Sequence, residues 1–330
     1  MVYERKRGLC FIFYLKDNFF YIIYYSFIKF DLFLFLIIFI DIMNIIYELP
    51  FIEEICSKIF IFACKSPHHG LGACILKKKL GINDLNIPEK DEDVIIFDAY
   101  EITNYPDRKS IDIYYYACFY NLIKLNLCCT DVFGDISNLK SLMNLTDIWL
   151  GDTEVTGDIA HLKSLHNFSD IWLKGTDVSG DIFHLNSLHY LTDIGLSWTR
   201  VTGNILHLKS LSNLIEIKLS NTGIRGDIFH LKSLENLTVI AFGNTEITGN
   251  IAELKSLSNL TEIYLGNYGD SNVTSDVCGD IENLKSLANL TTIELPFTSV
   301  TGNIECLKCL RMLEWINLDG TGVTGDIDGL

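Results

Sequence analysis

The sequence predicts an α/β solenoid with a parallel β-sheet on its concave face, preceded by a small helical cap domain. The main observation is a glycine that recurs every 23 residues, with one interval of 30, at Gly134, Gly157, Gly180, Gly203, Gly226, Gly249, Gly279, Gly302 and Gly325. Leucines keep the same step from Leu139 to Leu330. A unit this short cannot bury its own apolar face, so copies must stack and build one continuous core.

Each unit carries the same apolar pattern. The copy that starts at Leu145 reads LTDIWLGDTEVTGDIAHLKSLHN, with apolar residues at Leu145, Ile148, Leu150 and Val155. This resembles the LxxLxLxxNxL segment of the leucine-rich repeat family, and GDIxxLKSL is similar to the second half of its plant-type subclass. Thr153 and its copies replace the family's Asn, and Asp or Asn with Ile replaces Ile-Pro. The resemblance covers residues 122–330 in nine copies and implies a parallel strand ladder with hydroxyl groups beneath it.

The two ends of the chain depart from this pattern. Residues 1–46 are rich in Phe, Ile, Tyr and Leu, and residues 19–40 have the length of one transmembrane helix, although Lys29 and Asp31 lie within them. Two interpretations stay open: a membrane anchor with the repeats exported, or translated upstream sequence with the true start at Met43 and an intracellular protein. The ninth repeat stops at Leu330, directly after its GDIxxL, so we expect it to be truncated.

Residues 47–121 are predicted to form a small domain of helices and strands that caps the solenoid. Apolar spacing after Pro50 indicates an amphipathic helix, and residues 94–97 and 111–119 are predicted strands. Leu49-Pro50 followed by Ile59-Phe60 resembles an F-box, with a longer spacing than in that family. That resemblance implies a ubiquitin-ligase adaptor whose repeats capture a substrate.

Charge and motifs restrict the function. The net charge is −16, and residues 122–330 carry −13 of it, from 13 Lys and Arg against 26 Asp and Glu. This surface repels nucleic acid and favours basic partners. The chain has no Walker loop, dinucleotide fingerprint, GxSxG or HExxH motif, so we expect no enzyme, no cofactor and no metal site.

The predicted binding site is an acidic and aromatic concave face. Strand side chains alternate, so the residues between the apolar positions point away from the core. The candidate partner-binding residues are Asp147, Trp149, Asp170, Trp172, Asp193, Trp198, Glu216, Glu262, Tyr264, Phe297 and Trp315. Aromatic side chains supply much of the energy at protein interfaces. Repeat duplication could also copy one Asp and one Trp without a function, and Val239 and Thr292 show that the acidic position is not required structurally.

These observations predict a scaffold that binds a basic protein partner. The alternatives are an F-box-like adaptor and a membrane-anchored receptor-like protein. The expanded repeat inserts extra residues within Asn267–Cys278, at the rim of the predicted face, where a loop could add specificity.

Overall fold

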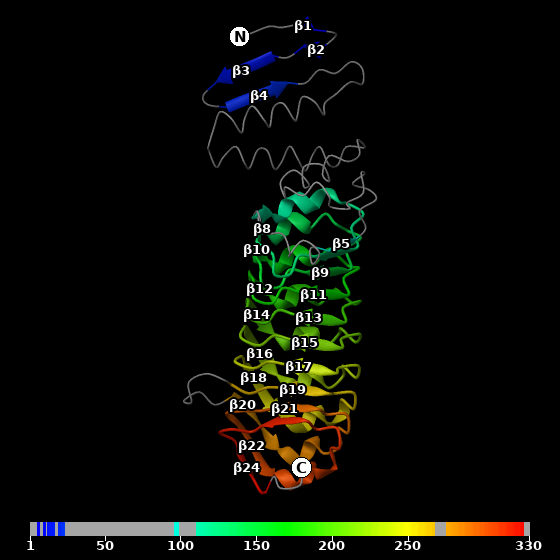
Figure 1. Cartoon of the computed structure of the whole chain (residues 1–330), viewed down its shortest axis with the longest axis vertical. Coiled ribbons are helices and arrows are strands. Elements are labelled where there is room, and N and C mark those ends of the chain that lie inside the picture. Colours follow the sequence, from blue (N-terminus) through cyan, green and yellow to red (C-terminus); the bar gives the residue numbers. More distant parts are fainter. Residues whose placement is uncertain are drawn as a thin grey trace. The chain divides into compact units, whose positions relative to one another are not determined.

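The computed structural model describes residues 96–98, 110–267 and 275–326, together with the backbone of four short strands before residue 24. The coils from residue 96 onward stack in sequence order (Figure 1). Each coil adds one strand to each of two parallel 10-stranded sheets. The predicted α/β solenoid with a parallel ladder is confirmed, and the second sheet was not predicted.

We call the sheet of three-residue strands the concave sheet. It consists of β5 (Ile96–Asp98), β7 (Lys124–Asn126), β9 (Asp147–Trp149), β11 (Asp170–Trp172), β13 (Asp193–Gly195), β15 (Glu216–Lys218), β17 (Val239–Ala241), β19 (Glu262–Tyr264), β21 (Thr292–Glu294) and β23 (Trp315–Asn317). The second sheet consists of β6 (Ile111–Asp112), β8 (Val132–Asp135), β10 (Glu154–Asp158), β12 (Asp177–Asp181), β14 (Arg200–Asn204), β16 (Gly223–Asp227), β18 (Glu246–Asn250), β20 (Ser275–Asp280), β22 (Thr298–Asn303) and β24 (Gly322–Thr324).

A short 3₁₀ helix follows each strand of the second sheet from β6 to β22. In the coil of β10, Gly157 has φ +104°, a conformation that L side chains rarely adopt. The Asp158 carboxylate then accepts a hydrogen bond of 2.7 Å from the Ala160 backbone N–H. The repeated GD and GN pairs therefore turn the chain and start the helices η4 (Ile136–Leu139), η5 (Ile159–Leu162), η6 (Ile182–Leu185), η7 (Ile205–Leu208), η8 (Ile228–Leu231), η9 (Ile251–Ser256), η10 (Ile281–Leu284) and η11 (Ile304–Cys309). The first helix, η3 (Ile113–Cys118), follows Ile111-Asp112 instead.

The repeated apolar positions form one core between the two sheets and the helices. In the copy of β9 and β10, Ile148, Leu150, Val155, Ile159 and Leu162 are all 0% exposed. The buried apolar side chains of each copy pack against those of the copies before and after it. The free energy of burial therefore comes from stacking, as the repeat pattern predicts.

One further coil precedes Leu122. Strand β5 pairs with β7 through Phe97 and Leu125, and β6 pairs with β8. The predicted strand over 111–119 is wrong after Asp112, because the Asp112 carboxylate accepts a hydrogen bond from the Tyr114 N–H at 2.9 Å and starts η3. The residues of the cap domain before residue 96, including the F-box-like segment, lie outside the described residues.

Hydrogen bonds from side chains join successive coils. The Asn213 amide donates to the His189 carbonyl at 2.8 Å, and five more asparagines do the same: Asn144, Asn167, Asn236, Asn259 and Asn289. We call this row the asparagine ladder. The threonines at the family's Asn position act differently, because Thr153 Oγ1 donates to the Leu150 carbonyl of its own coil at 2.7 Å.

The described strands near the N-terminus belong to a separate compact unit, Met1–Cys56. They are β1 (Arg5–Lys6), β2 (Leu9–Cys10), β3 (Ile12–Lys16) and β4 (Phe19–Ile23), and β3 pairs antiparallel with β4. Strand β4 occupies the first five positions of the predicted membrane helix, whose remainder lies outside the described residues. Within the described part of the chain, no helix has the length and hydropathy needed to cross a membrane.

Candidate functional site

The concave sheet places the predicted acidic residues in one column. The strand register puts Asp170 beside Asp147 on one side and beside Asp193 on the other, and Asp193 beside Glu216. Neighbouring strands lie about 4.8 Å apart, so these carboxylates are close neighbours across the sheet. We call these four residues the acidic column. Lys124 holds the same position on β7 and therefore stands at one end of it.

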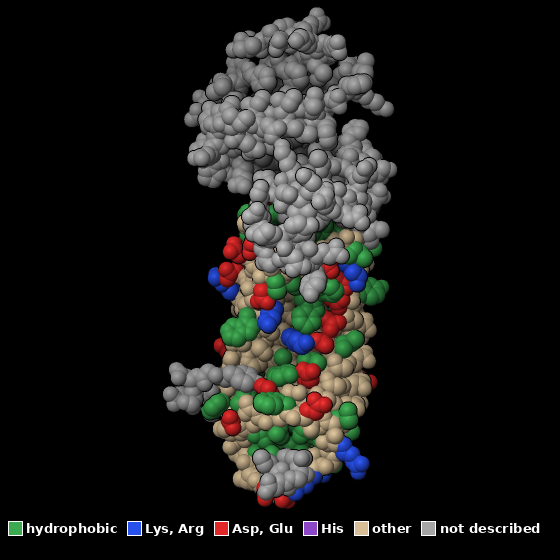
Figure 2. Space-filling view, in the orientation of Figure 1, with side chains coloured by type: hydrophobic (Ala, Val, Ile, Leu, Met, Phe, Trp, Pro, Cys, Tyr) green, Lys and Arg blue, Asp and Glu red, His purple; other side chains and the backbone are tan. Residues whose placement is uncertain are grey.

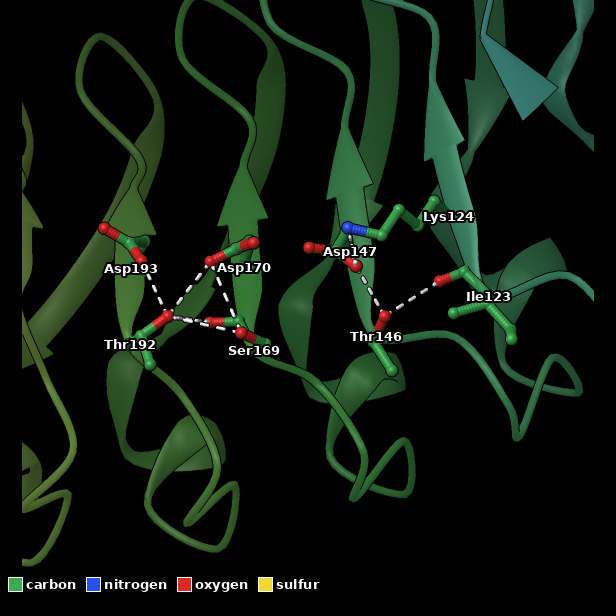
Figure 3. A network of polar contacts seen from close by, with 8 residues as sticks. All are labelled: Ile123, Lys124, Thr146, Asp147, Ser169, Asp170, Thr192 and Asp193. Atoms are coloured by element: carbon green, nitrogen blue, oxygen red, sulfur yellow. Dashed lines mark hydrogen bonds and ion pairs between the residues drawn. The ribbon is translucent and has the colours of Figure 1, made fainter. Parts of the chain in front are cut away.

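A hydroxyl group connects Asp170 and Asp193 of the acidic column (Figure 3). Thr192 Oγ1 lies 3.0 Å from Asp170 Oδ1 and 2.6 Å from Asp193 Oδ2. A hydroxyl has one hydrogen, so it can donate to only one of the two carboxylates at a time. Ser169 Oγ lies 3.2 Å from Thr192 Oγ1 and extends this network. These hydroxyls were not predicted from the sequence, although Thr or Ser directly precedes each Asp of the column.

The carboxylates of the column differ in their affinity for a proton. Burial and hydrogen bonds with Asp147 and Asp193 raise the pKa of Asp170 to about 7. Burial opposes ionisation of Asp147, but hydrogen bonds from Asp170, Thr146 and Lys124 outweigh it and lower the pKa of Asp147. Lys124 Nζ lies 3.2 Å from Asp147 Oδ2, and the Asp147 side chain is only 6% exposed. Asp147 therefore keeps its charge, and Asp170 takes up the proton near neutral pH.

The acidic column is only partly neutralised by cations. Lys124 pairs with Asp147 at one end, and Lys218 Nζ lies 2.6 Å from Glu216 at the other. In the described part of the chain, no lysine or arginine forms an ion pair with Asp170 or Asp193. The centre of the column thus presents carboxylates whose charge a partner could neutralise.

A second column on the same strands carries the tryptophans. Trp149 lies beside Trp172, and Trp172 lies beside Gly195. A Cβ added to Gly195 would lie 2.8 Å from Trp172 Cδ2, so the indole covers the space above this glycine. Lys218 Nζ lies 5.0 Å from the centre of the Trp172 ring, a cation–π contact. The Trp172 indole therefore covers Gly195 on the next strand and also contacts the ammonium group of Lys218.

Further along the sheet, Glu262 and Tyr264 lie on β19. The Tyr264 hydroxyl donates a hydrogen bond of 2.9 Å to Glu262 Oε2. Burial, followed by the hydrogen bond to Glu262, raises the pKa of Tyr264 to about 12. Val239 and Ala241 on β17 separate this pair from Glu216 and Lys218. The predicted face is therefore interrupted by an apolar strand.

The remaining predicted residues do not join the tryptophan column. Trp198 and Phe297 lie in the turns after their strands, with φ of +60° and +54°, and the Phe297 ring packs over Gly320. The inference that Trp198 shares the strand surface with Trp149 is wrong, because residue spacing does not reveal a left-handed turn. Trp315 lies on β23 at the position of the acidic column and is 58% exposed.

Acidic and hydrophobic side chains lie side by side along the visible face of the ladder (Figure 2). The expanded repeat adds a shift in strand register between Ser275 and Cys278 of β20, and residues 268–274 of its loop lie outside the described residues. No cluster of His, Cys, Asp and Glu suited to a metal ion occurs among the residues that the structure describes.

The stacked coils, the two parallel ladders and the LxxLxL strands define the leucine-rich repeat fold, and solved structures agree. The plant peptide hormone receptor RGFR1, in complex with RGF2, matches 73% of this chain and 42% of its own with 20% identity and a TM-score of 0.59. The Arabidopsis receptor kinase HAESA ectodomain, in complex with an N-terminally extended IDA peptide hormone, matches 68% of this chain and 38% of its own with 25% identity and a TM-score of 0.55.

An internalin of Listeria monocytogenes matches 76% of this chain and 81% of its own with 20% identity and a TM-score of 0.51. The chain spans about two fifths of the length of the plant receptor chains. No protein-family model matches the sequence, and no curated protein matches it. These likenesses establish the leucine-rich repeat fold.

Proposed function

We propose that the protein is an interaction scaffold whose concave sheet binds a basic segment of a protein partner. The observation that carries this proposal is the centre of the acidic column. Asp170 and Asp193 lie on adjacent strands and share a hydroxyl, and no cation of the described chain neutralises them. A Lys or Arg side chain placed between them would favour release of the proton that Asp170 holds near neutral pH, and it would then gain hydrogen bonds to ionised oxygens of both residues.

The tryptophans beside the column support the same function. Trp149 and Trp172 lie one strand position beyond Ile148 and Ile171, on the side that also carries the carboxylates. Tryptophan is enriched among the residues that dominate binding energy, and an aromatic ring can also accept a cation. The HAESA ectodomain, which has this fold, holds a peptide hormone. This supports a peptide segment as the part of the partner that is bound.

The experiment selects peptides from a displayed random library by binding to the full chain, and measures their affinity for variants. We expect enrichment of Lys and Arg, and about tenfold weaker binding to the double variant D170N/D193N. The matched control is E154Q/E246Q, which removes two negative charges from exposed positions of β10 and β18 in the second sheet. Equal losses in both variants, or peptides without basic residues, would contradict the proposal.

A further inference from the structure

Tyr190 and Ile215 lie in adjacent coils, at positions where other coils carry a side chain that hydrogen-bonds to the coil before. Tyr190 occupies the position of the asparagine ladder, between Asn167 and Asn213 in the repeat register. Ile215 occupies the position at which Thr192 and Thr238 place a hydroxyl on a carbonyl of the preceding coil, at 3.3 and 3.2 Å. Tyr190 lacks the amide of the asparagine ladder, and Ile215 lacks the hydroxyl of the threonine row, so the solenoid itself gives no reason for either change.

Both replacements are exposed and line the same groove. Tyr190 is 66% exposed and Ile215 is 39% exposed. The groove has a volume of about 610 Å³ and is open to solvent, and its remaining lining residues are Thr192, Asn213, Asn236, Thr238 and Asn259. It crosses four successive coils, from the coil of β13 to that of β19. Two apolar side chains therefore stand at one end of a groove whose other walls are polar.

The groove adjoins the acidic column. Thr192 lines the groove, and its hydroxyl lies 2.6 Å from Asp193 Oδ2. Ile215 directly precedes Glu216, the next member of the column. The apolar side chains of Tyr190 and Ile215 thus lie just before β13 and β15, next to the carboxylates of Asp193 and Glu216 on these strands.

We propose that this groove is the specificity-determining part of the concave site, and that it binds an extended peptide segment with an apolar side chain next to a Lys or Arg. This inference rests on the proposed function, and it adds an apolar side chain to the basic residue that the partner is expected to carry. The apolar side chain packs on Tyr190 and Ile215, and the cation lies on Asp193. Three coil steps of about 4.8 Å give a length of roughly 14 Å, which holds about four extended residues.

The test uses variants that restore the repeat consensus. Y190N/I215T returns a ladder amide and a ladder hydroxyl, so its fold is supported by the bonds that the other coils make. The control I123T/M312N restores the same two consensus residues at exposed apolar positions outside the groove. The probes are synthetic copies of the peptides selected on the full chain, measured by fluorescence anisotropy.

We expect an apolar residue beside the basic residue in the selected peptides, and about tenfold weaker binding to Y190N/I215T, with unchanged binding to I123T/M312N. If D170N/D193N loses binding and Y190N/I215T does not, the groove proposal is overturned and the basic-partner proposal stands. If neither variant loses binding, or if the library yields no peptide that binds, both proposals are overturned.

Discussion

The protonated carboxyl of Asp170 predicts an unusual effect of charge removal on stability. Asp170 lies between Asp147 and Asp193 on adjacent strands, and its pKa rises from 3.8 to about 7 in the folded protein. In the unfolded chain the same carboxyl ionises freely. The substitution D170N removes this difference and keeps an oxygen that can accept the hydrogen bond from Thr192. We therefore expect D170N to stabilise the protein at neutral and alkaline pH.

The size of the effect follows from the two pKa values. Below pH 3.8 both states hold the proton, so the group has no effect on the free energy of unfolding. As the pH rises to about 7, only the unfolded chain releases the proton, so the wild type loses stability, and above pH 7 the loss is complete. About 1.4 kcal/mol per pH unit gives a loss of roughly 4 kcal/mol. Asp170 is partly exposed, and screening by solvent reduces this to about 1–2 kcal/mol.

The assay is urea unfolding of wild type and D170N at pH 5 and pH 8, followed by circular dichroism. The free energy of unfolding of D170N, relative to that of wild type, should be about 1 kcal/mol higher at pH 8 than at pH 5. The variant E154Q, at an exposed position of β10, sets the baseline for removing one surface charge. A stability difference between D170N and wild type that is the same at both pH values, or that favours wild type at pH 8, would refute the reasoning.

Three further predictions concern single side chains. G157A should cost about 2–4 kcal/mol in urea unfolding, because φ is +104° and the new Cβ would lie 2.6 Å from Asp135 Oδ1, whereas G151A, with its closest contact at 3.5 Å, should cost under about 0.5 kcal/mol. W198N should raise the unfolding free energy by about 0.5–1 kcal/mol, because Asn tolerates the positive φ that strains Trp; weaker peptide binding by this variant would place Trp198 at the site. W172A should weaken peptide binding about 30-fold without unfolding the chain, and an unchanged affinity would remove the indole from the interface.

The concave sheet could be predicted from the sequence because its strands lie in the LxxLxL segment, where the apolar residues vary least between copies. Leu, Ile and Leu at fixed spacing leave one register in which all of them are buried. The second sheet escaped prediction because its strands from β8 to β22 each end in a polar Gly-Asp or Gly-Asn pair. The coil before Leu122 escaped because Phe97, Tyr116 and Phe119 fill its core positions, all under 5% exposed, and aromatic residues hid the leucine pattern.

The acidic column was predictable for a related reason. A residue that recurs every 23 positions on a parallel strand must meet its copy on the next strand, so the register alone brings Asp147, Asp170 and Asp193 together. The sequence could not show which carboxylate keeps a proton, because that depends on the distances to Thr192 and Lys124. It also placed Trp198 on the strand surface, because spacing gives no sign of a positive φ.

Tyr190 and Ile215 break structural rows in inner coils of the solenoid, where the coils on both sides keep the residues of the row. Each coil contacts only its neighbours, so a substitution at one coil changes the local surface while the rest of the solenoid keeps its contacts. The acidic residues are repeated yet dispensable for the fold, since Val239 holds the same position on β17. Tyr190 and Ile215 are the reverse case, because they give up bonds that other coils keep. Both kinds of residue meet at β13 and β15, which makes these strands the expected centre of partner recognition.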